Sequence, residues 1–200
     1  YYSSQISLSG DGKTIAISTD TKITVYEEGI IGYNGFTPIL GWKSKGGELT
    51  GDGIGNSISL DTMGNTLVSC GGSNTSDSVA IFEYNRTIFN WERENDPFVI
   101  QGFKCSISND GSKVAISDTL IDSFDSTSSQ VGGVKIFTKE NDTWSQKGIT
   151  FEGLLQNDQA GQHMVLSGDG DTLVFTTEQR NGFLPEYILI FDVESDNLQI

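Results

Sequence analysis

The sequence repeats one short pattern four times, and this repetition limits the fold more than any other feature. Each copy has an alternating run of apolar and polar residues, a glycine-containing turn and a second alternating run. The copies begin at residues 5, 57, 104 and 163 and align without a gap: QISLSGDGKTIAIS, SISLDTMGNTLVSC, KCSISNDGSKVAIS and HMVLSGDGDTLVFT. Alternation with a period of two is typical of a strand with one buried face. Turns of this kind favour hairpins because glycine adopts positive φ, so each copy predicts a β-hairpin.

Further elements follow each hairpin. A β-branched and aromatic run comes next in every copy, at residues 23–26, 79–82, 134–137 and 188–191, and successive runs are about 55 residues apart. An isolated tryptophan follows in three copies, at Trp42, Trp91 and Trp144, and Leu198 takes its place in the fourth. A recurring tryptophan could form a ligand platform, but we favour the interpretation that it packs each unit against the next. Four strands per unit without a helical period predict a four-stranded antiparallel sheet.

Four such sheets in one chain predict an all-β fold, namely a β-propeller of four-stranded antiparallel blades. A twisted sheet cannot bury both of its faces alone, so the blades are expected to pack radially and to share their apolar faces. We interpret residues 1–200 as a single domain with blades at about 1–48, 49–97, 98–152 and 153–200. Two arrangements fit this pattern: a closed ring of four blades, or part of a ring with more blades.

One repeat resembles a known group of sequences. The string GQHMVLSGDGDTLVF, with NDQA before it, resembles the propeller repeats grouped as FG-GAP-like or WD-like. This resemblance implies a propeller that serves binding or display, often in surface or extracellular proteins, and that is not usually an enzyme. The sequence departs from the integrin-type pattern because it has no D-x-D-x-D-G loop, so the calcium site of that family is not carried over. The W-D dipeptide of WD repeats is also absent.

The chain is strongly acidic, with 12 Lys and Arg against 27 Asp and Glu and a net charge of −15. Such a charge repels phosphate backbones and anionic lipid headgroups, so we expect neither nucleic-acid binding nor peripheral membrane attachment. No apolar run approaches the roughly 20 residues that a membrane helix needs, so we also expect no membrane insertion. Propeller geometry places the connections after the second and fourth strands of each blade on one face of the ring. We expect that face to attract cations or a basic partner, because these connections carry 12 acidic residues against Lys22 and Arg180: residues 18–22, 46–55, 70–78, 96–102, 117–133, 149–161 and 176–187.

Few residues suggest catalysis. His163 is the only histidine and aligns with the start of the innermost strand, so we interpret it as a polar residue of the central channel rather than as a general base. Asp11, Asp110 and Asp169 recur in the turns, where hairpin geometry accounts for them. We therefore predict no catalytic residue and no cofactor.

The cysteines and the sequons carry little functional information. Cys70 and Cys105 are expected to be free thiols, with a bridge between neighbouring units as the alternative. Asn74, Asn85 and Asn141 begin N-x-S/T sequons, in about the number that the composition yields by chance.

Two insertions are the better candidates for a site, because scaffolds of this kind place function on loops of varying length. Residues 117–133 expand the connection between the second and third strands of the third unit, and their Asp118, Asp122 and Asp125 could bind a hard cation such as Ca²⁺, although a solvated loop is the simpler interpretation. Residues 27–41 expand the connection between the third and fourth strands of the first unit. Their Tyr33, Phe36 and Ile39 are predicted to contact a partner or a neighbouring subunit.

The leading hypothesis is a non-enzymatic β-propeller interaction module that acts as a structural or binding subunit of a larger protein or assembly. The alternative is a carbohydrate- or cation-binding propeller that uses the acidic loop face. An enzyme of unknown class is the third hypothesis.

Overall fold

The computed structural model describes residues 4–19, 22–51, 54–71, 79–94, 102–122, 130–153, 155–177, 187–195 and 197–199. The described residues form 17 strands, and no described residue lies in a helix. In this part of the chain there is accordingly no helix that could span a membrane.

The strands form four antiparallel sheets, each made from consecutive strands in the order of the chain. The first sheet contains β1 (Gln5–Leu8), β2 (Thr14–Thr19), β3 (Lys22–Asn34) and β4 (Thr37–Ser44), and the short β5 (Leu49–Thr50) also pairs with β3. The second contains β6 (Ser57–Leu60), β7 (Thr66–Cys70), β8 (Val79–Asn85) and β9 (Asn90–Arg93). The third contains β10 (Lys104–Ile107), β11 (Lys113–Asp118), β12 (Gly133–Glu140) and β13 (Thr143–Glu152). The fourth contains β14 (Met164–Leu166), β15 (Thr172–Thr176), β16 (Ile188–Asp192) and β17 (Asn197–Gln199).

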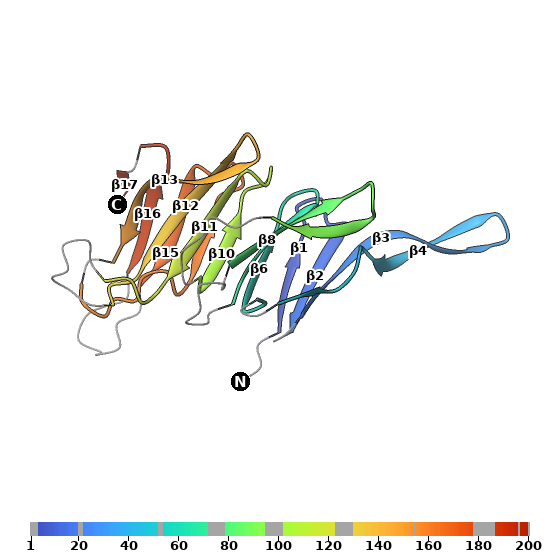
Figure 1. Cartoon of the computed structure of the whole chain (residues 1–200), viewed down its shortest axis with the longest axis horizontal. Helices are drawn as coiled ribbons and strands as arrows, with labels where there is room; N and C mark the ends of the chain where they lie inside the picture. The colour runs from blue at the N-terminus through green and yellow to red at the C-terminus, as the bar shows by residue number, and fades with distance from the viewer. Residues whose placement is uncertain are drawn as a thin grey trace.

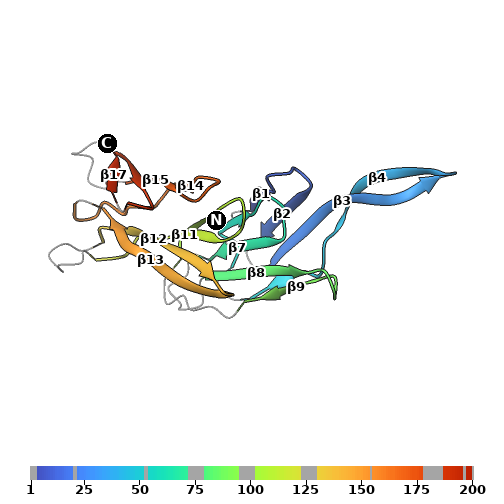
Figure 2. The same ribbon diagram turned by 90° about the horizontal axis from the view of Figure 1, so that it is seen from above.

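The four sheets stand side by side in chain order and form an open arc, with the first and fourth sheets at its two ends (Figures 1 and 2). The first strand of each sheet adjoins the first strand of the next, in the order β1, β6, β10, β14. The strands that the structure describes therefore form an open arc and not a closed ring of four sheets.

Each predicted hairpin is present in the register that the repeats imply. Gln5 pairs with Ser18 at the open end of the first hairpin, and Gly12 at its turn has a φ of 73°. The carboxylate of Asp11 accepts hydrogen bonds from the hydroxyl of Ser9 at 2.6 Å and from the amide of Lys13 at 2.9 Å. The same arrangement recurs at Asp110 and Asp169. These aspartates therefore act as acceptors that hold the turns, as the repeats predict.

Consecutive turns are also bonded to one another. The backbone amide of Asp11 donates a hydrogen bond to the carbonyl of Thr62 at 3.0 Å. In the same way, the amide of Thr62 donates to the carbonyl of Asn109 at 2.9 Å, and the amide of Asn109 donates to the carbonyl of Gly168 at 2.7 Å. A run of backbone hydrogen bonds thus links the four sheets through their turns.

The hydrophobic core lies between neighbouring sheets. Three clusters of buried side chains fill the three gaps: the first and second sheets share one, the second and third another, and the third and fourth the last. Trp91 and Trp144 are buried in the first two of these clusters, each against the preceding sheet. The predicted packing role of the tryptophans is therefore confirmed for these two, with the contact made to the preceding unit rather than the following one.

One predicted connection is replaced by strands. Residues 27–41 are expected from the sequence to form a long connection, but β3 and β4 extend through them and leave only Gly35 and Phe36 between Asn34 and Thr37. The physical reason is that Ile30, Ile31 and Tyr33 favour extended backbone, while Gly35, with a φ of 64°, allows a tight turn.

Candidate functional site

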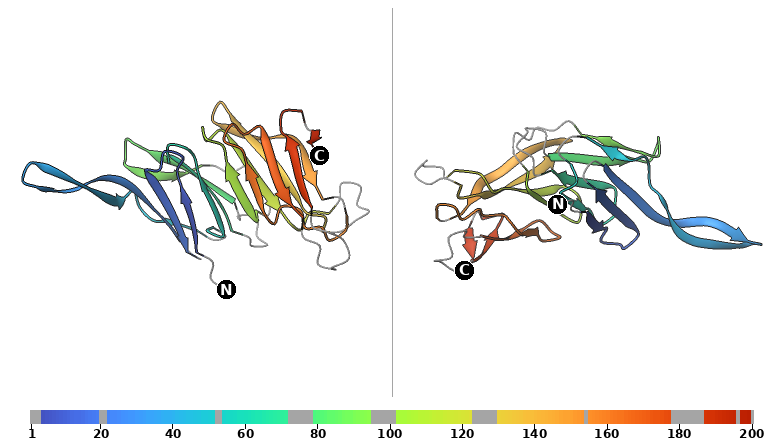
Figure 3. Two further views of the ribbon diagram at one scale, coloured as in Figure 1. Left: turned by 180° about the vertical axis from the view of Figure 1, so that it is seen from behind. Right: turned by 90° about the horizontal axis from the view of Figure 1, so that it is seen from below.

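The most distinctive surface element is the end of the β3–β4 hairpin, which we call the arm and define as residues 29–41. The pairing of β2 with β3 ends at Glu27, and beyond this point β3 pairs only with β4 in the described structure. The arm therefore leaves the sheet as a two-stranded ribbon, and it projects well away from the body of the molecule (Figures 1 and 3).

The arm is apolar and carries no charge. Its sequence, GIIGYNGFTPILG, has no charged residue in a chain in which such residues make up 20%. Phe36 at its tip is fully exposed, and its other large apolar side chains are also exposed: Ile30, Ile31, Tyr33, Ile39 and Leu40. Contiguous apolar surface of this kind marks interaction sites in soluble proteins.

Strand pairing divides the arm into two faces. Ile30 pairs with Leu40 and Tyr33 with Pro38, and successive residues of β4 alternate between faces, so these four side chains share one face. Ile39 lies on the opposite face. A shift in register between Ile30 and Gly32 marks a β-bulge, which inserts Ile31 as an extra residue. A side chain at Gly41 would lie within 2.5 Å of Ile31, so Gly41 leaves room for it.

The three predicted contact residues thus all lie on the arm, but not on one face. Tyr33 and Ile39 lie on opposite sides of the ribbon, and Phe36 lies at its tip. Sequence reasoning missed Ile30, Ile31 and Leu40, which extend the apolar surface. The absence of charge from the whole segment was the signal that could have found them.

The predicted cation ligands lie apart from the arm. The carboxylate of Asp118 accepts a 2.9 Å hydrogen bond from the backbone amide of Leu120. The carboxylate of Asp122 accepts one of the same length from the backbone amide of Gln130. Asp125 lies outside the described residues. Among the residues that the structure describes, no group of three His, Cys, Asp or Glu side chains could hold a metal ion.

The predicted acidic loop face falls largely outside the described part of the chain. Seven of its 12 acidic residues are not described: Asp20, Asp52, Asp77, Asp96, Asp125, Glu178 and Glu186. The charge of that face stays a prediction from the sequence.

The other singled-out residues are placed as follows. His163 is exposed and precedes β14, and its carbonyl accepts the amide of Thr176. Cys70 and Cys105 are buried free thiols, as expected. Of the three sequons, Asn74 lies outside the described residues, whereas Asn85 ends β8 and Asn141 lies in the β12–β13 turn.

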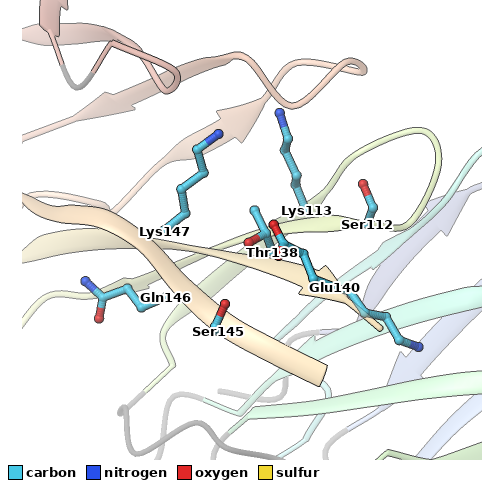
Figure 4. A pocket seen from close by; sticks show the side chains of 8 residues that line it. Ser112, Lys113, Thr138, Glu140, Ser145, Gln146 and Lys147 are labelled. Carbon is cyan, nitrogen blue, oxygen red and sulfur yellow. The ribbon is translucent and has the colours of Figure 1, made fainter. Parts of the chain in front are cut away.

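A cavity on the third sheet gathers several lysines (Figure 4). Lys113 and Lys147 both extend toward the fourth sheet, where Lys113 pairs with Asp171 at 2.6 Å and both pair with Glu194. Partial burial lowers the pKa of Lys113, but its hydrogen bonds to Asp171 and Glu194 outweigh this effect and raise it. Through these ion pairs, Lys113 and Lys147 connect the third sheet to the fourth.

A similar cluster joins the second and third sheets. Lys139 of β12 forms ion pairs with Glu83 of β8, at 2.5 Å, and with Glu94. The carboxylate of Glu94 also accepts a hydrogen bond from the indole nitrogen of Trp144. Burial lowers the pKa of Lys139, and the two carboxylates more than compensate and raise it. The charged side chains in these gaps hold neighbouring sheets together.

No protein-family model matches the sequence, and no curated protein matches it. Among solved structures, the chain is similar to hydrazine synthase of Kuenenia stuttgartiensis, with a TM-score of 0.60 and 16% identity over 96% of this chain and 46% of that one. It is also similar to TolB from Acinetobacter baumannii, with a TM-score of 0.53 and 13% identity over 97% of this chain and 42% of that one. A proposed 6-phosphogluconolactonase from Bacteroides uniformis has a TM-score of 0.53 and 16% identity over 98% of this chain and 53% of that one.

Four antiparallel four-stranded sheets around a common arc, together with these neighbours, decide the architecture. The fold is a β-propeller. The predicted fold class is thus confirmed, and each sheet is a blade. The chain spans about half the length of the solved structures that it matches, and at this level of identity the likeness concerns the fold alone. Membership of the FG-GAP-like or WD-like repeats stays a prediction.

Proposed function

We propose that this chain is a non-enzymatic β-propeller module that binds a protein partner through the arm. The observation that carries the proposal is the uncharged, exposed apolar ribbon at residues 29–41, held away from the body of the molecule by the first blade. An isolated two-stranded ribbon is marginally stable in water, so a partner that covers it would also stabilise it.

The arm offers a partner two kinds of contact. Its exposed side chains can enter an apolar groove, and full burial of one such side chain contributes about 1.5–3 kcal/mol. Its strand edges carry backbone donors and acceptors, which can pair with an extended segment of another chain. A protein that presents an apolar groove or a free strand edge fits both features.

The charged clusters of the blades are consistent with a structural rather than a catalytic role. Lys113 and Lys139 are each bound by two carboxylates that lie in a neighbouring blade. Side chains paired in this way stabilise the packing of blades, and the arm is then the element left for recognition.

Site-specific photo-cross-linking tests the proposal. A photoreactive phenylalanine analogue replaces Phe36 in the protein expressed in cells of its native source. In the matched control, the same analogue replaces Phe89, an exposed aromatic residue at the turn between β8 and β9. We expect one discrete cross-linked protein from position 36 and none from position 89. Equal cross-linking from both positions, or the same partner bound after the arm is removed, would contradict the proposal.

A further inference from the structure

The same type of hydrogen bond recurs at each of the three boundaries between blades. At each boundary, a serine in the first strand of one blade accepts a hydrogen bond from a backbone amide in the first strand of the following blade. Leu60 donates to Ser7 at 3.0 Å, Ile107 to Ser59 at 3.3 Å, and Leu166 to Ser106 at 3.1 Å. Leu8 occupies the matching donor position of the first blade. Its amide would meet such a serine from a preceding blade.

The boundaries also share a close contact at the hairpin turns. A Cβ atom added to Gly64, Gly111 or Gly170 would lie within 3 Å of a side chain of the preceding blade: Thr14, Thr66 and Lys113, respectively. Gly12 has the same place in the first blade and a similar φ of 73°, but nothing lies within 4 Å of its Cβ position. The first blade therefore has the contact surface of an inner blade without the neighbour.

The exposed fractions of side chains at equivalent positions of the blades also show that the first blade lacks a neighbour on this side. Leu8 is 57% exposed, whereas Leu60, Ile107 and Leu166 are 7%, 7% and 4% exposed. Trp42 is 46% exposed, whereas Trp91 and Trp144 are 6% and 4% exposed. Ile6 and Ile17 are also exposed on this side of the blade. We call the surface formed by Ile6, Leu8, Ile17 and Trp42 the leading face.

We propose that the leading face is the docking surface for one further propeller blade, which differs from the fourth blade of this chain and supplies a serine or threonine hydroxyl to the amide of Leu8. The occupant is a four-stranded antiparallel sheet, because the leading face continues the pattern of the three boundaries within the chain. The surface is distinct from the arm.

The fourth blade does not have the surface that this docking requires. Val165 occupies the position of Ser7, Ser59 and Ser106, so it offers no acceptor to the amide of Leu8. A buried backbone donor that is left without a hydrogen-bond partner destabilises such a contact. The two ends of the arc are therefore not complementary to each other.

A second position shows the same mismatch. At each boundary a glycine packs against a small residue of the preceding blade: Gly55 against Ser18, Gly102 against Cys70 and Gly161 against Ser117. In the aligned repeats, Thr176 holds the place of the small residue in the fourth blade, and Ser3 holds the place of the glycine in the first blade. Both members of this contact are therefore larger at the two ends of the arc than at the three boundaries. Closely packed boundaries tolerate added methyl groups poorly.

The test uses a second copy of the chain as the probe. In the variant Val165→Ser/Thr176→Ser, the fourth blade gains the missing hydroxyl and the smaller residue. The matched control, Val165→Ala/Thr176→Ser, lacks only the hydroxyl. Adding Leu8→Arg to the first variant blocks the leading face. The changes at Leu8 and Val165 are expected to leave the fold intact because both side chains are more than half exposed, and Thr176→Ser is common to all three variants. Sedimentation velocity measures association, and hydrogen exchange measures protection of the Leu8 amide.

We expect concentration-dependent head-to-tail association of the serine variant, with about tenfold or greater protection of the Leu8 amide. The alanine control, the variant with Arg at position 8 and the unchanged chain should show neither effect. Protection of Leu8 in the unchanged chain by association that Leu8→Arg abolishes would overturn the proposal, since the fourth blade would then suffice. Identical behaviour of the serine and alanine variants would overturn it as well, since the hydroxyl would then have no role.

Discussion

The indole nitrogen of Trp91 donates a 2.7 Å hydrogen bond to the backbone carbonyl of Lys45, across the boundary between the first and second blades. The ammonium group of Lys45 in turn donates to the carbonyl of Gly64 at 2.6 Å and lies 4.8 Å from the centre of the Tyr84 ring. Burial lowers the pKa of Lys45. The two blades are thus joined by a buried set of polar contacts as well as by apolar packing.

Trp91→Phe removes the indole donor and keeps an aromatic ring in the gap between the blades. We expect the free energy of unfolding to fall by about 1–2 kcal/mol, because a buried carbonyl loses its partner. Urea denaturation measures this change. Trp42→Phe is the matched control, since Trp42 is half exposed in the first blade. Equal effects of the two substitutions would contradict the assigned role of Trp91.

Replacing residues 29–41 with Asn-Gly between Glu28 and Trp42 removes the arm and leaves a short hairpin turn. We expect the midpoint of thermal unfolding to change by no more than about 2–4 °C, because the arm lies outside the three buried clusters. Binding of the cross-linked partner should be lost. A large fall in the unfolding temperature would show that the arm supports the blades instead.

Three turn aspartates should make stability depend on pH in the acid range. A hydrogen bond from Ser9 lowers the pKa of Asp11, and one from Ser167 lowers that of Asp169. For Asp110, burial raises the pKa, but hydrogen bonds from Ser108 and Ser112 outweigh it and lower the pKa.

Their folded-state pKa values lie below the ordinary value of 3.8, so their stabilising contribution is present above pH 3.8 and is lost as the pH falls through the folded-state values. The variant Asp11→Asn/Asp110→Asn/Asp169→Asn should be less stable than the unchanged chain at pH 6. The difference should shrink as the pH falls below 3.8. Urea denaturation across this range checks the prediction, and a difference that is constant with pH would refute it.

The two cysteines should be unreactive in the folded chain. Burial raises the pKa of the Cys70 thiol well above its ordinary value, and the neighbouring thiol of Cys105 raises it further. The thiol of Cys105 donates to the carbonyl of Ser57 at 3.3 Å. Because the thiolate is the reactive form, we expect a thiol reagent at pH 8 to react on the order of 100-fold more slowly than in urea. Rapid reaction of both thiols in the native chain would contradict this placement.

The sequence predicted the hairpins well because local chemistry determines them. Gly12, Gly64, Gly111 and Gly170 all have positive φ at the turns, and the alternation in residues 5–18 gives the pairing of Gln5 with Ser18. Four repetitions of this unit predict the four blades. The recurrence of tryptophan at one place in the unit predicts the packing role that Trp91 and Trp144 have.

The arm and the boundary contacts were harder to predict. Glycine, asparagine and proline within GYNGFTPILG suggest a loop, whereas pairing of two strands with a bulge at Ile31 makes it a ribbon. Ser7, Ser59 and Ser106 occupy polar positions of an alternating pattern, which says nothing about a neighbouring blade. Their role depends on the distance between separate sheets, and the pattern within one sheet does not contain that information.

The run of backbone hydrogen bonds from Asp11 through Thr62 and Asn109 to Gly168 makes the chain a linear array with coupling between nearest neighbours. In such an array each internal blade is stabilised from two sides and each terminal blade from one. When no further blade covers the leading face, opening should therefore begin at the first and fourth blades and progress inward. The second and third blades would retain their slowest-exchanging amides until the whole array unfolds.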